Sequence, residues 1–503
     1  MAGKVWFWSR KHLGLQSLSP QAWRDGIPES TDTVIVCDNY ALPPAWRDLG
    51  EPLVLNAGAS TFSLWSWAEV SLRLKRSGVA VMEPVQVPST YRIYKISLFH
   101  LQMIHVERIQ TLDKRLIAMV DHREPSSNTP DYNLRFSGDR ACLEGSSTQS
   151  SSIAAPKLGY LRQQELSDIL SRRMTRLALK SMHAVGLDFG SVVVHVEDNG
   201  RCTVASMQVP RASELQEGIW QEAIQKFAAN WSDPLLSSGT DSSVKPLLIG
   251  ADPEFLLLSK QGKVVSAEKY LEGGHGAGCD AVLVGGRVIY PVAELRPAPA
   301  DSPDALASNI RRLLIQANAR ITDHSLRWAA GGMPVPGFAL GGHIHLSGVR
   351  LTSRLLRQLD SYVALPLAML EAPNDQARRP RYGTLGDFRY QPHGGFEYRT
   401  LASWLVSPVA AKGAFALMLL CARETDHLHY RPSENEALVD AYYTGDRETL
   451  KGCLDRLSDS ISATSSYKEL SQWIDPLILA AREGRTWNVD QDIRVKWRIC
   501  AQE

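Results

Sequence analysis

The chain has 503 residues, with 55 lysines and arginines against 54 aspartates and glutamates, which gives a formal net charge of +1. This length suffices for two to four domains, and the balanced charge excludes a broad electrostatic surface for nucleic acid or an anionic membrane. Seven scattered cysteines and the lack of any long apolar run, at the N-terminus or elsewhere, predict a reducing, cytoplasmic location and no membrane partner.

The N-terminal half mixes predicted strands and helices. DTVIVCD and YRIYKISLFHL read as strands, whereas SLWSWAEVSLRLKRSG and ELSDILSRRMTRLALKSMHAVG have apolar residues at helical spacing and end on glycine. The short strands GSVVVHVED and RCTVASMQV flank the turn DNG and predict a hairpin. We expect a first domain over residues 1–229 and a linker over 230–246, because NWSDPLLSSGTDSSVKP is rich in Ser, Gly and Pro.

Residues 247–503 form the second predicted domain. Strands are expected around Leu248, Val282 and Val288, then a helix over 303–322, a strand in GGHIHLSG, a helix over 353–370 and a strand in GGFEYRTLAS. From Val409 onward the pattern is mostly helical. The chain is therefore predicted to be α+β, and it carries neither a GxGxxG nor a GxxxxGK[ST] nucleotide-binding loop.

Acids and histidines are concentrated in the second domain. In GADPEF, Asp252 and Glu254 lie two residues apart and share one strand face, as His343 and His345 do in GGHIHLSG. Asp280 follows a glycine-rich turn, and Glu294 lies in an apolar strand, where a carboxylate needs a partner. A solvated strand face, turn chemistry and core histidines remain the simpler alternatives for these residues.

Arginines follow the histidines. The loop ARRPRYGTLGDFRYQPHGG contains Arg378, Arg379 and Arg389, whose forked donors match phosphate or carboxylate oxygens, and Glu397 and Arg399 share a face of the next strand. Solvated arginines and a plain Glu–Arg pair are the alternatives. Together the clusters supply oxygen and nitrogen ligands for divalent cations plus donors for phosphate, which indicates phosphoryl transfer with Mg²⁺ or Mn²⁺.

The order of these motifs resembles a known family. GADPEF, ELRP, GGHIHLS, RRPRYG, DFR and GGFEYRTLASW resemble the phage-associated amidoligase family COOH–NH2 ligase type 2, within the glutamine synthetase and glutamate–cysteine ligase superfamily, over roughly residues 247–424. The resemblance implies a glutamine synthetase-like antiparallel sheet with flanking helices. It also implies an ATP-dependent ligase that joins an amino acid or peptide carboxylate to an amine through an acyl phosphate, in a chain that can form a homo-oligomer.

The resemblance also implies roles for individual residues. Two or three Mg²⁺ or Mn²⁺ ions would be held by Asp252, Glu254, Asp280, Glu294, His343 and Glu397. ATP would be bound by His345, Arg378, Arg379, Arg389 and Arg399, with either Arg378 or Arg379 facing the site. Arg389, Glu397 and Arg399 would also act in catalysis. Asp252 departs from the glutamate that glutamine synthetases use at the first position.

The N-terminal half resembles a different family. GLDFGSVVVHVEDNGRCTVASMQVPRA is similar to the end of an ATP-grasp domain, and the region from PLVLN to VAVMEP is similar to the segment that precedes one. The family's metal-binding Asp, Glu and Asn fall on Val193, Ser206 and Gln208, so the carboxylates that would hold Mg-ATP are not matched. We therefore expect a degenerate ATP-grasp-like module that positions a substrate or supports the ligase domain, with an unrelated α/β domain as the alternative.

Two other functions fit part of the pattern. A metal-dependent hydrolase or cupin-like enzyme would bind one transition metal with the two histidines, His393 and an acid, which leaves several arginines and acids without a role. A non-catalytic scaffold would be consistent with the degenerate N-terminal half.

Overall fold

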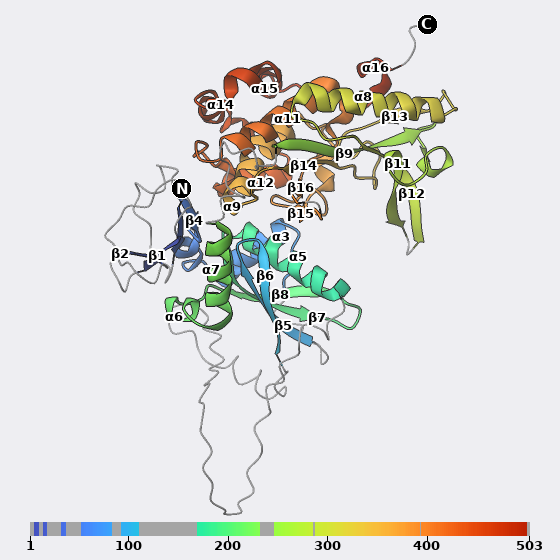
Figure 1. Cartoon of the computed structure of the whole chain (residues 1–503). Helices are drawn as coiled ribbons and strands as arrows, with labels where there is room; N and C mark the ends of the chain where they lie inside the picture. Colours follow the sequence, from blue (N-terminus) through green and yellow to red (C-terminus); the bar gives the residue numbers. More distant parts are fainter. Residues whose placement is uncertain are drawn as a thin grey trace, which may run out of the picture.

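The computed structural model of the chain describes residues 5–9, 14–17, 32–36, 52–82, 92–109, 168–231, 246–284, 287–392 and 394–499. We call residues up to 231 the N-terminal half and those from 246 the C-terminal half; in Figure 1 they lie below and above. The predicted linker lies mostly outside the described residues, and helix α7 (Gly218–Trp231) extends past the predicted domain end at 229. The division into two domains at this point therefore stays a prediction.

The described residues of the N-terminal half form two four-stranded sheets. The antiparallel sheet has the order β6-β5-β7-β8 and consists of β5 (Arg92–Phe99), β6 (Gln102–Ile109), β7 (Phe189–Val196) and β8 (Cys202–Gln208). The mixed sheet has the order β2-β1-β3-β4 and consists of β1 (Val5–Ser9), β2 (Gly14–Ser17), β3 (Thr33–Val36) and β4 (Leu53–Leu55). The predicted hairpin is the β7–β8 pair.

Helices cover both faces of the antiparallel sheet. They are α2 (Ala59–Phe62), α3 (Trp67–Arg76), α5 (Asp168–Ala184), α6 (Ala212–Leu215) and α7. Helix α3 begins at a capping box in which Ser66 and Glu69 satisfy each other's backbone N–H groups. The helices α3 and α5 share one apolar cluster with the sheet, and α7 shares another with Phe99 and Phe189 on the opposite face.

The C-terminal half is built on one eight-stranded antiparallel sheet, as predicted. Its path is β11-β12-β9-β14-β16-β15, and β10 and β13 also pair with β9. The strands are β9 (Leu248–Leu258), β10 (Val264–Val265), β11 (Gly276–Val284), β12 (Arg287–Arg296), β13 (Arg327–Ala329), β14 (Gly342–Ser347), β15 (Phe388–Tyr390) and β16 (Phe396–Tyr398). With the helices below, they confirm the α+β class.

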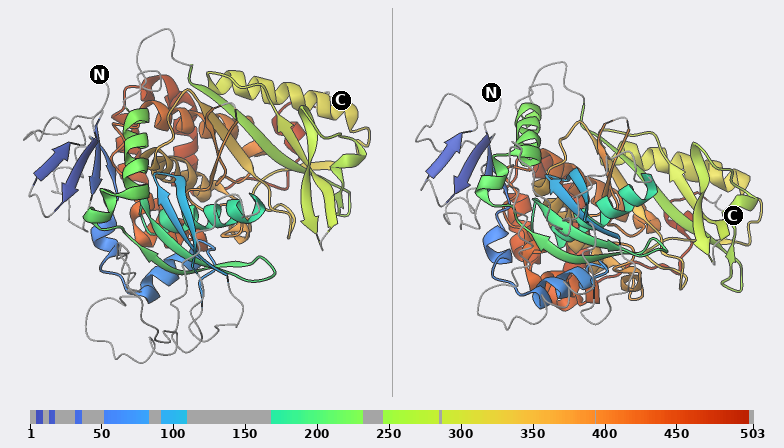
Figure 2. Two further views of the ribbon diagram at one scale, coloured as in Figure 1. Left: turned by 60° about the horizontal axis from the view of Figure 1, so that its bottom comes forward. Right: turned by 90° about the horizontal axis from the view of Figure 1, so that it is seen from below.

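Helices pack on one side of this sheet, with α8 and α11 running above it in Figure 1 and seen from other sides in Figure 2. The α-helices are α8 (Pro303–Arg320), α9 (Ser353–Leu359), α10 (Leu365–Leu370), α11 (Pro408–Arg423), α12 (Glu436–Thr444), α13 (Arg447–Lys451), α14 (Leu454–Ser462), α15 (Tyr467–Arg482) and α16 (Ile493–Lys496). Short 3-10 turns are η4 (Ala267–Lys269), η6 (Asp375–Arg378), η7 (Trp404–Val406) and η8 (Pro432–Glu434). The predicted helix 303–322 matches α8, whereas the helix 353–370 contains a π-helical turn, η5 (Asp360–Ala364). No helix of the described chain is both long and apolar enough to cross a membrane.

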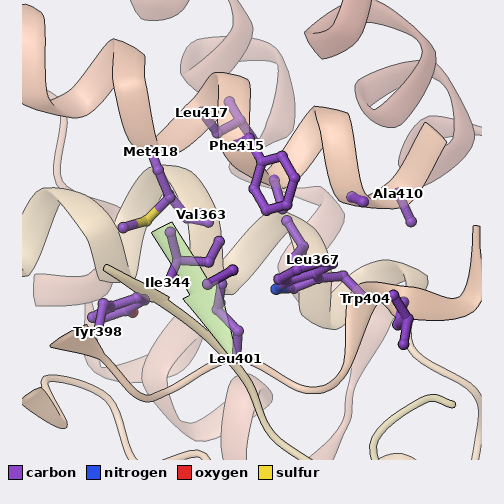
Figure 3. Packing of buried hydrophobic residues seen from close by; sticks show 14 of the residues in the cluster. Ile344, Val363, Leu367, Tyr398, Leu401, Trp404, Ala410, Phe415, Leu417 and Met418 are labelled. Carbon is purple, nitrogen blue, oxygen red and sulfur yellow. The ribbon is translucent and has the colours of Figure 1, made fainter. Parts of the chain in front are cut away.

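The core of the C-terminal half determines which strand face carries polar chemistry. Figure 3 shows Ile344 of β14 and Tyr398 of β16 pointing into an apolar cluster with Phe415 and Met418 of α11. Side chains alternate along a strand, so the neighbours His343 and Glu397 point away from this core. The helices thus leave the other face of the sheet available for a site.

Candidate active site

The centre of the sheet brings one histidine between two carboxylates from neighbouring strands. His343 pairs with Asp252 in the β14–β9 register, and its Nδ1 lies 3.2 Å from Asp252 Oδ1 and 3.2 Å from Glu397 Oε1. Each of these residues offers a ligand atom within 4.8 Å of those of the other two. We call Asp252, His343 and Glu397 the histidine cluster.

Glu397 is fully buried and surrounded by donors. Its Oε2 accepts hydrogen bonds from Arg389 Nε at 2.7 Å and Gln391 Nε2 at 2.9 Å, and its Oε1 lies 3.0 Å from Arg399 Nε. The Arg389 side chain is 57 % exposed, so it lies at the mouth of the site. The geometry can therefore present two guanidinium groups beside one carboxylate, which suits an anionic ligand.

A second group of acids lies beside the first. Glu254 of β9 faces Glu294 of β12 directly, and each offers a carboxylate oxygen within 4.8 Å of one another and of Asp280. We call Glu254, Asp280 and Glu294 the acidic cluster. Asp252 and Glu254 share one face of β9, which places the two clusters side by side. Like charges directly opposite each other destabilise a sheet, so this arrangement favours a bound cation.

Two acids of the second cluster have different neighbours in the protein. Glu254 Oε2 accepts a hydrogen bond from the backbone N–H of Gly341 at 2.6 Å, and Glu294 forms an ion pair with Arg296. Position 341 needs glycine, because a Cβ atom there would lie 2.5 Å from His343 Nε2. Gly341 therefore serves both clusters.

The protonation states follow from burial and from these neighbours. Burial raises the pKa of Glu254 to about 7, against the opposing influence of His343 and Gly341. Burial acts to raise the pKa of Asp252, but contacts with His343 and His345 hold it well below the ordinary value. Burial acts to lower the pKa of His343, but Asp252 and Glu254 raise it above the ordinary value. Without a bound cation, the neighbouring carboxylates therefore stabilise the protonated form of His343.

The residues of both clusters fit divalent cations. Asp252 Oδ1 and Glu397 Oε1 are buried, and within the described chain neither accepts a hydrogen bond of good geometry. Such an arrangement is costly unless a ligand completes it. Carboxylate oxygens with one imidazole suit Mg²⁺ or Mn²⁺.

The remaining predicted residues divide into two groups. His345 lies at the edge of the histidine cluster, with Nε2 3.2 Å from Asp252 Oδ2. Arg378 instead donates to the carbonyls of Thr400 and Leu401, and Arg379 pairs with Glu371. The structure does not bring these two arginines to the clusters: Arg378 holds the backbone after β16, and Arg379 holds Glu371 and the Tyr442 carbonyl of α12.

Sequence reasoning missed three contributors to the site, namely Gln391, Arg296 and Gly341. Gln391 follows Arg389 at strand spacing, so the period-two pattern could have found it. Gly341 carries no chemical signal of its own, because its role depends on the position of His343. His393, on which the single-metal alternative depended, lies outside the described residues.

The candidate site lies within the part of the chain that matches a known family. Residues 249–499 match the family model of the phage phiEco32-like COOH.NH2 ligase type 2. No curated protein matches the chain. Among solved structures, a bifunctional glutathione synthetase from Pasteurella multocida is similar over 50 % of this chain and 51 % of its own, about half its length, with 10 % identity and a TM-score of 0.32. GmaS without ligand is similar over 56 % of this chain and 76 % of its own, with 13 % identity and a TM-score of 0.28. At these scores neither likeness bears on function.

Proposed function

Because the chain belongs, through residues 249–499, to the phage phiEco32-like COOH.NH2 ligase type 2 family, we propose that it is an ATP-dependent ligase that joins a carboxylate to an amine. The observation that carries this proposal is the pair of adjacent clusters on one sheet face, bordered by Arg389 and Arg399. Ligands for more than one divalent cation, next to donors for an anion, are what transfer of a phosphoryl group requires.

Within this proposal, the two clusters hold the metal ions. Asp252, His343 and Glu397 bind one ion, and Glu254, Asp280 and Glu294 bind another. When bound, these ions neutralise the charge of the ATP phosphates. His345 lies next to the histidine cluster and is assigned to the nucleotide.

The arginines orient the reacting groups. Arg399 is held against Glu397, and Arg389 has more than half of its side chain in solvent, so its guanidinium group can meet a phosphate or carboxylate that enters the site. Fixed donors of this kind stabilise charge as it develops and hold the reactants in line. Arg378 and Arg379 have no place in this assignment, because their donors serve the surrounding backbone and Glu371.

The proposed reaction has two steps. The substrate carboxylate attacks the γ-phosphorus of ATP, and ADP leaves. The amine nitrogen then attacks the carbonyl carbon of the acyl phosphate, inorganic phosphate leaves, and the nitrogen loses a proton to give an amide. We propose an amino acid or peptide as the carboxylate substrate, by analogy with the family resemblance.

We assign the N-terminal half a supporting role. Its antiparallel sheet carries Val193 opposite Ser206, and no group of potential metal ligands was found on it among the described residues. A degenerate ATP-grasp-like origin and a cytoplasmic location remain part of the proposal.

The test is a screen of the full chain with ATP, Mg²⁺ and pooled amino acids and peptides. We expect ADP release that depends on both a carboxylate and an amine. Glu397→Gln should abolish it, and Glu448→Gln, which alters an exposed glutamate that forms an ion pair with Lys451, should leave it unchanged. Turnover of substrate without ATP, or full activity in Glu397→Gln, would contradict the proposal.

A further inference from the structure

A cavity lies between the two halves of the chain. Its volume is about 520 Å³, within the range of roughly 300–1,000 Å³ that is typical of small-molecule sites. One wall comes from α3, from α2 and the end of α5, and from residues beside them, and the other comes from α9 and residues 425–443. Both halves of the chain therefore supply walls of this cavity, and such a boundary is a common position for ligand sites.

This cavity is separate from the candidate active site. His183 lines it, and His183 Nε2 lies 2.6 Å from Asp360 Oδ2. Asp360 also accepts a hydrogen bond from the Tyr398 hydroxyl at 2.7 Å. Tyr398 follows Glu397 in β16 and points to the opposite face of the sheet. None of the six candidate metal ligands lines the cavity.

Positive charge predominates on the cavity walls. Five arginines line it against three carboxylates. The arginines are Arg73, Arg76, Arg354, Arg357 and Arg431, and the carboxylates are Asp188, Glu434 and Glu436. Two histidines, His183 and His429, add groups that can gain charge.

The carboxylates neutralise these arginines incompletely. Glu436, with a side chain 48 % exposed, is shared by Arg73 at 2.9 Å and Arg76 at 3.0 Å. Glu434, 45 % exposed, is shared in the same way by Arg431 at 3.2 Å and Arg357 at 4.0 Å. Ion pairs with exposed carboxylates contribute little, so Arg73, Arg76 and Arg431 depend on two weak partners. Arg357 is also held by the buried Asp188, with Nη1 2.7 Å from Oδ1.

Arg354 adds a buried charge to the same wall. Its carboxylate partner, Asp426 at 3.1 Å, is 60 % exposed, whereas the Arg354 side chain is 9 % exposed. Burial, together with nearby Arg431, lowers the pKa of Arg354 to about 10. Cationic groups are thus crowded where solvent screens them least, and an anion would relieve that crowding.

Apolar side chains complete the lining, among them Trp65, Leu385, Leu428 and Val439. We propose that this cavity binds a small organic anion, with a phosphate or carboxylate group against the arginines and an apolar body against these side chains. Forked guanidinium donors match two oxygens of either group. This site is independent of the proposed ligase activity.

The test is calorimetric titration of the full chain with phenyl phosphate and, separately, with benzoate. EDTA keeps divalent cations away from the two clusters. The ionic strength is held constant, so that the screening of charges is the same in every titration. We expect saturable binding of at least one probe, and the probe that binds identifies phosphate or carboxylate as the recognised group. Arg431→Gln and Arg76→Gln should each weaken binding about tenfold or more, since each removes a charge-assisted contact.

Two control variants separate this site from other effects. Arg423→Gln alters an arginine paired with the exposed Glu469 and should bind like the wild type. Glu254→Gln alters the acidic cluster and should also leave binding unchanged. Absence of saturation with both probes would overturn the proposal, as would unchanged affinity in Arg431→Gln or lost affinity in Glu254→Gln. None of these results depends on ligase turnover.

Discussion

His183 Nε2 lies 2.6 Å from Asp360 Oδ2, and this contact joins a helix of the N-terminal half to the strands that carry Arg389 and Glu397. Asp360 Oδ1 accepts hydrogen bonds from the Tyr398 hydroxyl at 2.7 Å and from the Gly386 N–H at 2.8 Å. Tyr398 is the neighbour of Glu397, and Gly386 begins the turn into β15. Helix α5 therefore braces the strand pair that brings Arg389 to Glu397.

His183→Ala should destabilise the protein by about 1–3 kcal/mol. The substitution leaves the fully buried Asp360 carboxylate with one partner fewer. His183→Gln retains a donor and should recover part of the loss. Urea unfolding measures both, and hydrogen exchange at the Gly386 amide should become faster in His183→Ala. Wild-type stability and exchange in His183→Ala would show that the contact has no supporting role.

Gly386→Ala should destabilise the protein more than Gly262→Ala does. Both glycines have a positive φ, +72° and +73°, so both substitutions carry a backbone cost of about 1–2 kcal/mol. A Cβ at position 386 would also overlap the imidazole of His183, whereas position 262 has open space. We expect a further cost of about 1–3 kcal/mol at position 386 in urea unfolding. Equal losses at the two positions would mean that α5 does not press on this turn.

Arg379→Met should reduce stability by about 3–5 kcal/mol, because it leaves the buried Glu371 without its cationic partner. Nucleotide affinity of the folded fraction should stay unchanged, since the Arg379 donors go to Glu371 and the Tyr442 carbonyl. Thermal unfolding and ATP titration check the two expectations. A variant of normal stability that has lost ATP affinity would restore Arg379 as a phosphate ligand.

Affinity for Mn²⁺ should fall as the pH falls below 7. Burial raises the pKa of Glu254 to about 7, so at lower pH a bound cation must displace its proton, and the raised pKa of His343 acts in the same direction. For one displaced proton the affinity falls about tenfold per pH unit well below the pKa, and above the pKa it levels off. Glu254→Gln should weaken binding and flatten this dependence. Calorimetry in buffers of different ionisation enthalpy counts the protons released, and an affinity that is constant from pH 6 to 8 would exclude this coupling.

Strand periodicity predicted much of the site. The spacing of two residues in DPE, HIH and EYR places Asp252 and Glu254, the two histidines, and the Glu397–Arg399 pair on single strand faces, and the structure has them so. The meeting of Glu254 with Glu294 was not predictable from spacing, because it depends on the register of β9 against β12.

The arginine loop shows where sequence reasoning fails. Arg378, Arg379 and Arg389 look alike as a set of loop cations, but their partners lie at different separations along the chain: backbone carbonyls 22 and 23 residues away for Arg378, and Glu371 and Glu397, each 8 residues away, for Arg379 and Arg389. Only tertiary contacts decide which guanidinium groups support the backbone and which border the clusters. The brace between α5 and Asp360 was invisible for the same reason, since it joins residues 177 positions apart.

The most direct test of carboxylate activation at these clusters is oxygen-isotope transfer. The carboxylate substrate identified in the screen, labelled with ¹⁸O in both oxygens, is incubated with the full chain, ATP, Mg²⁺ and the amine, and the released phosphate is analysed by mass spectrometry. If the carboxylate attacks the γ-phosphorus, each phosphate released with the amide product carries one ¹⁸O atom. Amide product accompanied by unlabelled phosphate would contradict an acyl phosphate and the reaction proposed for this site.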